Sequence, residues 1–317
     1  MNAKEISRDL MKGERIALSK AITLVESTLE NHQELAQEIL KECISVTGNS
    51  LRIAITGVPG VGKSTFIEAL GLHLTAKGIK VAVLAVDPSS ELSGGSILGD
   101  KTRMQGLSSN KLAFIRPTPS SGSLGGVAKK TRETILLCEA AGYEIILIET
   151  VGVGQSETAV HSMVDFFLLL MLAGAGDELQ GIKRGIMEMV DGIVINKADG
   201  DNIINAKKAQ SQYQSALHLF PPTDSAWTPK VLYCSSLEKT NIDIVWNMID
   251  NFQNHMQKRG LIVQKRKNQN QNWLHEMIKE TLNQRFYKDH QEQIHKLEKE
   301  VLNTKITPSQ ALKKLLP

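Results

Sequence analysis

Apolar residues in the middle of the chain gather in short, nearly continuous runs of Val, Ile, Leu and Phe, separated by polar and glycine-containing stretches. Such runs, in place of strict apolar–polar alternation, are typical of strands covered on both faces of a parallel sheet. They predict strands at 51–56, 81–86, 113–116, 144–149, 166–172, 192–196 and 231–234. Helical patterns at 63–77 and 127–141 lie between some of these strands. The order predicts the α/β class, with a doubly wound, mostly parallel sheet that binds its ligand at the carboxyl ends of the strands.

The N-terminal end of the chain shows a helical period instead. Leu18, Ile22 and Val25 recur at roughly helical spacing within residues 4–46, which predicts two or three amphipathic helices. A Gly-Asn-Ser turn then separates this helical segment, residues 1–48, from the first strand.

The C-terminal end follows a sheet domain that we expect to span residues 49–262. A polar run at 264–272 predicts a break in the chain. From Leu274 and Ile278 onward, apolar residues recur four apart, as on one face of a helix. This pattern predicts a helical arm at 263–317. We expect the apolar stripe of this arm to be buried against another surface. That surface could be the chain's own sheet domain or a second subunit.

Composition limits the classes of protein that the chain can represent. It has 317 residues, of which 41% are hydrophobic and 22% are charged, as in soluble globular proteins with a sizeable core. The formal net charge of +3 is too small to indicate binding to nucleic acid. Basic residues cluster at 265–267 and 313–314, and we interpret them as a solvated linker and tail, with a binding patch as the alternative.

Neither a membrane segment nor a disulfide framework is indicated. The most apolar run, at 166–175, is far shorter than the about 20 residues that cross a bilayer, and the N-terminus has no apolar signal core. Cys43, Cys138 and Cys234 lie far apart in apolar patterns without metal-ligand spacing, so we expect buried thiols. These features predict a cytoplasmic protein with no membrane partner.

The most specific motif lies between the first strand and the helix after it. It has the form Gly-x-x-x-x-Gly-Lys-Ser, a phosphate loop whose backbone N–H groups surround phosphates at a helix N-terminus. Lys63 is expected to reach the β- and γ-phosphates, and Ser64 to offer its hydroxyl to Mg²⁺. The predicted nucleotide-binding residues here are Gly57, Val58, Pro59, Gly60, Val61, Gly62, Lys63, Ser64 and Thr65.

A second motif, Asn-Lys-x-Asp after the sixth strand, identifies the base. The carboxylate of Asp199 can accept hydrogen bonds from both N1–H and the exocyclic amine of guanine, a pair of donors that adenine lacks. Lys197 would lay its stem along the base, and a loop after the last strand stands where base contacts belong. The predicted base-binding residues are Asn196, Lys197, Asp199, Ser235, Ser236 and Leu237. GTP is thus the predicted substrate and GDP the product, with a simple turn after a strand as the alternative for the Asn-Lys-x-Asp motif.

Acidic residues at other strand ends indicate a metal ion. Glu149 stands in Glu-Thr-Val-Gly, where proteins of this kind commonly have Asp-x-x-Gly. Asp87 ends the second strand and Asp100 follows in a loop, although each could belong to an ordinary turn. Several acids around one triphosphate need a cation, so Mg²⁺ is the predicted cofactor. We expect metal binding by Ser64, Asp87, Asp100 and Glu149, and catalysis by Lys63, Glu149, Asp87 and Asp100.

The chain also has long Gly/Ser-rich loops at 88–100, 117–126 and 173–181. Loops of this length in a compact domain are commonly functional. We interpret the first and third, together with 149–158, as switches ordered by the γ-phosphate. No glutamine follows Gly152 directly, since Gln155 comes three residues later, and Arg103 and Arg116 are candidates for an arginine finger. We therefore expect slow intrinsic hydrolysis, on the order of 10⁻³–10⁻² s⁻¹.

Longer strings resemble one family. They are ITLVES at 22–27, VDPSS at 86–90, SGGSILGDKTRM at 93–104, LGGVA at 124–128, ETVGVGQSE at 149–157 and GAGDELQGIK at 174–183. Together they resemble the MeaB/ArgK GTPases, the G-protein chaperones of adenosylcobalamin-dependent methylmalonyl-CoA mutase. The resemblance covers roughly residues 13–260.

The resemblance implies a fold, a partner and an assembly. The fold is a SIMIBI-type G domain of the P-loop NTPases, flanked by an N-terminal helical segment and a C-terminal dimerisation arm, so a homodimer is expected. The partner is an adenosylcobalamin-dependent acyl-CoA mutase, whose cofactor loading and protection are gated by GTP hydrolysis. The family's metal residues map to Ser64, Asp87, Asp100 and Glu149, and its third switch maps to about 174–188.

Other functions remain open at this point. A nickel-insertion GTPase would place Cys or His near the switches, whereas His161 is isolated and is interpreted as structural. A regulatory or metallocentre-assembly GTPase with a different client is a second alternative. The older family label, an arginine/ornithine transport kinase or ATPase, is a third, which the guanine motif opposes.

Overall fold

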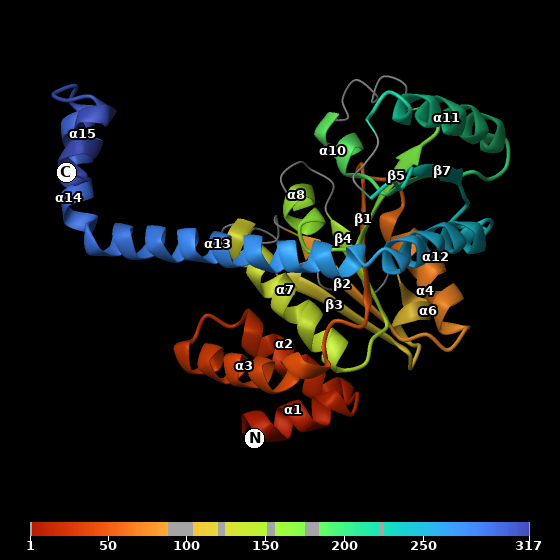
Figure 1. The fold of residues 1–317 in the computed structure, drawn as a ribbon, viewed down its shortest axis with the longest axis horizontal. Helices are drawn as coiled ribbons and strands as arrows, with labels where there is room; N and C mark the ends of the chain where they lie inside the picture. The colour runs from red at the N-terminus through yellow and green to blue at the C-terminus, as the bar shows by residue number, and fades with distance from the viewer. Residues whose placement is uncertain are drawn as a thin grey trace. The chain divides into compact units, whose positions relative to one another are not determined.

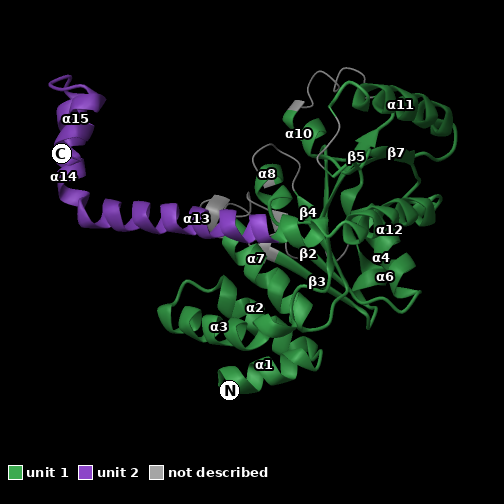
Figure 2. Cartoon of the chain, in the orientation of Figure 1, with its two compact units in different colours: residues 1–266 green, residues 267–317 purple. Residues whose placement is uncertain are grey.

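The computed structural model describes residues 2–87, 104–119, 124–150, 156–174, 184–221 and 225–316. The chain divides into two compact units, residues 1–266 and 267–317, which Figure 2 shows in different colours. The larger unit holds a β-sheet with helices on both faces, and the smaller unit is helical.

One parallel sheet of seven strands forms the centre of the larger unit, in the order β3-β2-β4-β1-β5-β6-β7 (Figure 1). Each neighbouring pair of these strands is parallel. The strands are β1 (Leu51–Gly57), β2 (Val81–Asp87), β3 (Ala113–Pro119), β4 (Ile145–Thr150), β5 (Phe166–Leu172), β6 (Gly192–Asn196) and β7 (Lys230–Tyr233). The predicted doubly wound α/β sheet is therefore confirmed, with all seven predicted strands.

Helices cover both faces of this sheet. The apolar core on one face includes residues of α1 (Ala3–Met11), α2 (Arg15–Glu26), α3 (Glu30–Cys43), α7 (Leu124–Ala140), α8 (Ser156–His161), α10 (Arg184–Met189) and α11 (Asn202–Leu217). The core on the other face includes residues of α4 (Lys63–Thr75), α6 (Gln105–Ser108) and α12 (Ile242–Lys258). The result is a three-layer sandwich.

Alternate residues of β5 show why the apolar runs are continuous. Phe166 and Leu168 belong to the core beneath α4 and α12, whereas Phe167 and Leu169 belong to the core on the opposite face. Phe166 packs edge-on against Phe252 of α12, with ring centroids 4.9 Å apart. Because both faces of the strand are covered, both sets of positions are apolar.

β1 lies at the point where the strand order changes direction. β2, β3 and β4 lie on one side of it, and β5, β6 and β7 on the other. In open parallel sheets, a crevice forms at the carboxyl ends of the strands at such a point, and ligands bind there. The loop that follows β1 is therefore in the position expected for a binding site.

The N-terminal segment consists of α1, α2 and α3, followed by a short 3₁₀ turn, Ile44–Val46. Several polar contacts join it to the sheet domain. Arg116 of β3 forms an ion pair with Glu26 at the end of α2, and Gln37 of α3 donates a 2.9 Å hydrogen bond to Glu133 of α7. The side chain of Arg116, considered above as an arginine finger, is thus taken up by an ion pair with the helical segment.

The predicted polar break at 264–272 contains the boundary between the two compact units, after Arg266, but it does not interrupt the helix. α13 runs without interruption over Leu261–Asp289 and includes this whole polar stretch. The residues there are mostly Gln, Lys, Arg and Asn, and the first three have good helix propensity although they give no apolar pattern.

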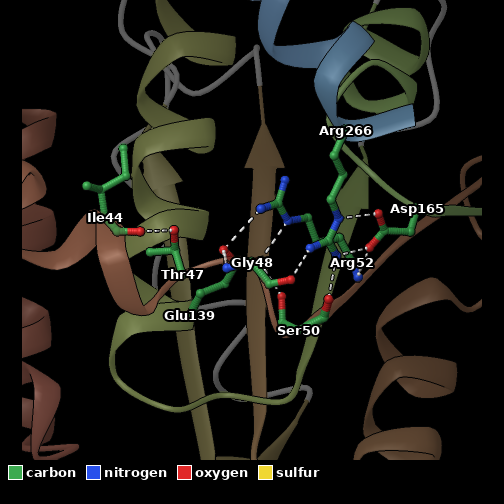
Figure 3. A network of polar contacts seen from close by, with 8 residues as sticks. All are labelled: Ile44, Thr47, Gly48, Ser50, Arg52, Glu139, Asp165 and Arg266. Atoms are coloured by element: carbon green, nitrogen blue, oxygen red, sulfur yellow. Dashed lines mark hydrogen bonds and ion pairs between the residues drawn. The ribbon is translucent and has the colours of Figure 1, made fainter. Parts of the chain in front are cut away.

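The interpretation of residues 265–267 as a solvated linker also needs correction, because Arg266 belongs to a buried ionic network (Figure 3). Its guanidinium donates to both carboxylate oxygens of Asp165, at 2.8 and 2.6 Å, and to backbone carbonyls of the loop before β1. Arg52 pairs with Glu139 at 2.9 and 3.0 Å, and its backbone N–H donates to Asp165 at 2.8 Å. Burial opposes the charge of Arg266, but the hydrogen bond and the charge of Asp165 outweigh it and raise the pKa of Arg266.

The smaller unit contains the rest of α13, with α14 (Gln291–Leu302) and α15 (Pro308–Leu315). Lys314 of α15 pairs with Glu300 of α14 at 3.1 Å. The predicted apolar stripe on α13 is exposed in this chain: Leu274 at 57%, Ile278 at 45% and Leu282 at 60%. None of the helices in the described part of the chain is long and apolar enough to cross a membrane.

Candidate nucleotide-binding site

The phosphate loop connects β1 to α4, as its motif requires. Gly57 has φ +147°, and a Cβ added to it would lie 2.4 Å from the carbonyl oxygen of Leu170 in the neighbouring strand. Gly62 has φ +92°, and a Cβ there would lie 2.9 Å from the side-chain nitrogen of Asn196. Both positions combine a left-handed or unusual backbone with close neighbours, so the motif needs glycine at each of them.

α4 begins directly after Gly62 with no side-chain cap. The first N–H groups of a helix have no partner within the helix, and they carry the positive end of its dipole. A helix N-terminus without a cap at the end of a glycine-rich loop is a ready binding site for phosphate.

Lys63, the first residue of α4, folds back over the loop. Its ammonium donates hydrogen bonds to the carbonyl oxygens of Gly57 at 2.9 Å and Val58 at 3.4 Å. Burial lowers the pKa of Lys63, and the negative charges of Glu149 and Glu157 act in the opposite direction. The ammonium of Lys63 is thus held against the backbone at the start of the phosphate loop.

Ser64 and Glu149 are brought together by the pairing of β1 with β4, in which Ile55 is opposite Glu149. The Ser64 hydroxyl donates a 2.9 Å hydrogen bond to Oε1 of Glu149. A hydroxyl and a carboxylate oxygen side by side are the hard donors that Mg²⁺ prefers, so these residues fit that ion.

The other two predicted metal ligands cannot be placed in the same way. The backbone of Asp87 ends β2, which pairs with β4, but the side chain of Asp87 and the whole of Asp100 lie outside the described residues. Within the described ranges, no group of three or more His, Cys, Asp or Glu side chains could hold a metal. Metal binding by Ser64, Asp87, Asp100 and Glu149 stays a prediction.

Asn196, at the end of β6, ties three loops together. Its side-chain nitrogen donates to the carbonyl of Val61 in the phosphate loop at 2.8 Å. Its oxygen accepts from the backbone N–H and the hydroxyl of Ser236, at 3.2 and 2.7 Å, and from the thiol of Cys234 at 3.6 Å. Burial raises the pKa of Cys234 to about 12, so this thiol stays protonated and can donate.

Asp199 is oriented by the loop after β7. The hydroxyl of Ser235 donates to Oδ2 of Asp199 at 2.7 Å and accepts from the backbone N–H of Glu238 at 3.1 Å. Lys197, which lies between Asn196 and Asp199 in the sequence, adopts φ +58°. Leu237, in the loop after β7, is 77% exposed. The structure therefore brings the two predicted base loops together, with the carboxylate of Asp199 held by a neighbouring hydroxyl.

The predicted switch segments lie largely outside the described residues, including all of 88–100, residues 151–155 and residues 175–181.

His161 packs edge-on against Phe167, with ring centroids 5.4 Å apart, and burial lowers its pKa to about 4. A neutral, packed imidazole agrees with the structural interpretation of His161.

Sequence reasoning missed Glu157, in the first turn of α8. Its side chain is only 2% exposed, and its charge acts on Lys63. The available signal was an acid at the start of the helix after the Glu-Thr-Val-Gly stretch, which is also a common helix-stabilising position.

A phosphate loop at the switch point of a parallel sheet, next to an Asn-Lys-x-Asp loop, defines a P-loop nucleotide-binding protein of the GTPase class. Residues 18–291 match the family described as methylmalonyl Co-A mutase-associated GTPase MeaB, and the chain belongs to this family.

Individual relatives agree. The chain is 52% identical to GTPase ArgK of Escherichia coli (strain K12), over 87% of this chain and 83% of that protein. It is 48% identical to the methylmalonic aciduria type A homolog, mitochondrial, of Mus musculus, over 97% of this chain and 77% of that protein. A crystal structure described as LAO/AO transport system kinase superposes with a TM-score of 0.80 at 42% identity, covering 99% of this chain and 96% of the other. The chain is therefore a nucleotide-binding GTPase that hydrolyses GTP.

Proposed function

We propose that this GTPase binds GTP with Mg²⁺ at the site described above and serves as the chaperone of an adenosylcobalamin-dependent acyl-CoA mutase of the methylmalonyl-CoA mutase type, gating the loading and protection of its cofactor. The observation that carries the proposal is the family match over residues 18–291, since the description of that family names the mutase. The name of the mouse relative, methylmalonic aciduria type A homolog, points the same way.

The residues of the chain can be given roles in this activity. Backbone N–H groups of the phosphate loop and the first turn of α4 hold the phosphates, and Lys63 leaves its two carbonyl acceptors to reach them. Ser64 and Glu149, already in contact, would hold Mg²⁺, which neutralises charge that develops on the phosphates. Asp199 accepts the two guanine donors, and Ser235 keeps its carboxylate oriented.

We also propose that two copies of the chain pair through the helical arm. The exposed stripe of Leu274, Ile278 and Leu282 on α13 supports this proposal, because an apolar helix face of this kind commonly packs against another helix.

The experiment that tests the chaperone role is steady-state GTP hydrolysis with and without the cobalamin-dependent mutase of the same organism. A rise of about tenfold or more, as a partner that supplies transition-state contacts can produce, would support the proposal. The Lys63→Ala variant serves as the background control, because it should lose tight triphosphate binding. An unchanged rate, with no complex formed under GDP or a GTP analogue, would contradict the mutase as client.

A further inference from the structure

Two buried hydroxyls join the carboxyl ends of β1 and β4. The hydroxyl of Thr150, the last residue of β4, donates a 2.8 Å hydrogen bond to the hydroxyl of Thr56, near the end of β1. Each of the two threonines is 1% exposed. Thr56 directly precedes Gly57 of the phosphate loop, and Thr150 directly follows Glu149. The hydroxyl pair therefore links the phosphate loop to the strand that carries the proposed metal ligand.

This link lies one residue beyond the backbone pairing of the two strands. The register of β1 with β4 ends with Ile55 opposite Glu149. Past that pair, β1 stays in register with β5, and β4 stays in register with β2. Thr56 and Thr150 are the next residues on the two strands, so their side-chain bond holds the strand ends together beyond the last pair.

The surroundings of the hydroxyl pair are apolar. Side chains alternate along a strand, so Thr56 and Thr150 face the same side of the sheet as Ala54 and Ile148. The core on that side includes Ala54, Ile148 and Val160 of α8. Replacing both partners of a buried hydrogen bond by apolar groups of the same shape is nearly neutral for stability or even stabilising. Two valines would thus serve packing as well as the two threonines do, and the hydroxyls point to a role other than stability.

On the opposite face of β4, Glu149 contacts the first turn of α4. Its Oε1 accepts a 2.9 Å hydrogen bond from the hydroxyl of Ser64. Because the phosphate loop connects α4 to β1, the spacing between the ends of β1 and β4 sets the spacing between Ser64 and Glu149. Mg²⁺ demands nearly ideal octahedral geometry, with ligands at about 2.0–2.1 Å. A small shift of either strand end would therefore weaken the binding of this ion.

We propose that Thr56 and Thr150 are positioning residues, whose hydrogen bond fixes the phosphate loop relative to Glu149 and so supports the Mg²⁺-dependent step of GTP hydrolysis. The inference rests on the proposed function, because Ser64 and Glu149 must be metal ligands. Neither hydroxyl has to contact the nucleotide, since the pair acts through the strand ends that it joins.

The test is the double variant Thr56→Val with Thr150→Val, which removes both hydroxyls and keeps the shape. In denaturant titration, this variant should be as stable as the wild type or more stable. At saturating GTP and Mg²⁺, kcat should fall by about tenfold or more, because small misplacements of reacting groups are costly. Calorimetry with a non-hydrolysable GTP analogue should give unchanged affinity in EDTA. The gain in affinity on adding Mg²⁺ should fall by about tenfold.

Two further variants separate positioning from a structural role. Thr56→Ser with Thr150→Ser keeps both hydroxyls and should recover most of kcat and of the Mg²⁺ effect. The matched control is Thr75→Val, at the far end of the 13-residue helix α4. Thr75 is 5% exposed and accepts a 3.0 Å hydrogen bond from the side chain of Asn110. This control should lower stability but leave kcat and the Mg²⁺ effect unchanged.

A folded double-valine variant with the kcat and the Mg²⁺ effect of the wild type would overturn the proposal. An equal loss of analogue affinity with and without Mg²⁺ would overturn it too, because the hydroxyls would then serve the phosphate loop alone. Should the double variant fail to fold, Thr150→Val alone replaces it with the same readouts. Failure of both to fold would make the pair structural and would also contradict the inference.

Failure of the proposed function gives a different result. A wild-type protein that binds neither GDP nor the analogue would contradict the nucleotide site itself, and the inference with it. A wild-type protein that binds the analogue equally well with and without Mg²⁺ would contradict the metal site, and again the inference with it.

Discussion

At the scale of the residue, the side chains of the nucleotide site are oriented by hydrogen bonds to other groups of the protein. Asp199 is held by Ser235, and Asn196 joins the phosphate loop to the loop after β7. Such preorganisation lowers the ordering cost of binding, because the groups that recognise the base do not have to be immobilised by it. Single substitutions in this network should therefore change specificity more than stability.

The Asp199→Asn substitution should redirect the site from guanine to xanthine. An Asn amide can donate to the C2 carbonyl of xanthine, where guanine has an amine, whereas the carboxylate of Asp199 needs two donors. We expect GDP affinity to fall by about tenfold or more and XDP affinity to exceed it. Calorimetry with both nucleotides measures the switch. Ser235→Ala should lose part of the GDP affinity with no gain for XDP, and unchanged GDP affinity in the Asn variant would remove Asp199 from the base site.

Replacing Thr134 by Val should stabilise the protein. The Thr134 hydroxyl, on α7, is fully buried, and its Oγ1 has no hydrogen-bond partner in the described structure. An apolar group of the same shape removes the cost of burying it, so the free energy of unfolding should rise by about 1 kcal/mol. Thr131→Val on the same helix is the matched control, because the Thr131 hydroxyl donates to the carbonyl of Val127 at 2.8 Å. Chemical denaturation should order the variants Thr134→Val, wild type, Thr131→Val, and the reverse order would contradict the assignment.

At the scale of the element, buried ion pairs connect helices to strands at the end of the sheet opposite the phosphate loop. The network of Figure 3 joins the loop before β1, the end of α7, the start of β5 and the first turns of α13. The side chains of Arg266 and Asp165 are 13% and 1% exposed, so their pairing takes place largely out of water. Charges in that position are costly when either partner is removed.

The Arg266→Met substitution should destabilise the chain strongly. It leaves the carboxylate of Asp165 buried without its bidentate partner, a loss of about 3–5 kcal/mol in the free energy of unfolding. Lys267→Met, at the exposed neighbouring position, is the control and should change stability by less than about 0.5 kcal/mol. Adding Asp165→Asn to Arg266→Met should recover part of the loss. Denaturant titration of the four proteins decides the matter, and equal stability of the two single Met variants would show that the pair contributes nothing.

At the scale of the whole molecule, the chain contains a nucleotide domain and a helical unit with an apolar stripe. The stripe lies on the part of α13 that belongs to the smaller unit, residues 267–317. Our proposal that it pairs two chains gives a prediction that does not depend on nucleotide chemistry.

The Ile278→Ser substitution should weaken self-association. Ile278 is in the middle of the stripe, and losing its apolar surface should raise the dimer dissociation constant by roughly tenfold or more. Lys279→Ser changes the adjacent exposed residue and should have little effect. Light scattering over a range of protein concentrations measures the change. A wild-type protein that stays monomeric at tens of micromolar would refute pairing through this stripe.

The sequence by itself determined the strands, the sheet class and the phosphate loop. A strand buried on both faces needs apolar residues at every position, as Phe166 to Leu169 of β5 show. Because these residues are consecutive, the requirement can be recognised in the sequence. The glycines at 57 and 62 are equally local, because a backbone φ near +150° or +90° excludes most side chains whatever surrounds them.

The tertiary structure alone decided which distant residues meet. Arg266 lies 101 positions from Asp165, and nothing in the polar run around it marks that partner, so residues 265–267 were misjudged as a solvated linker. Asn196 donates to the carbonyl of Val61, 135 positions away in the sequence, only because β6 ends beside the phosphate loop. Local patterns report the cost of exposing each residue to water, whereas the pairing of charges depends on how the whole chain is brought together.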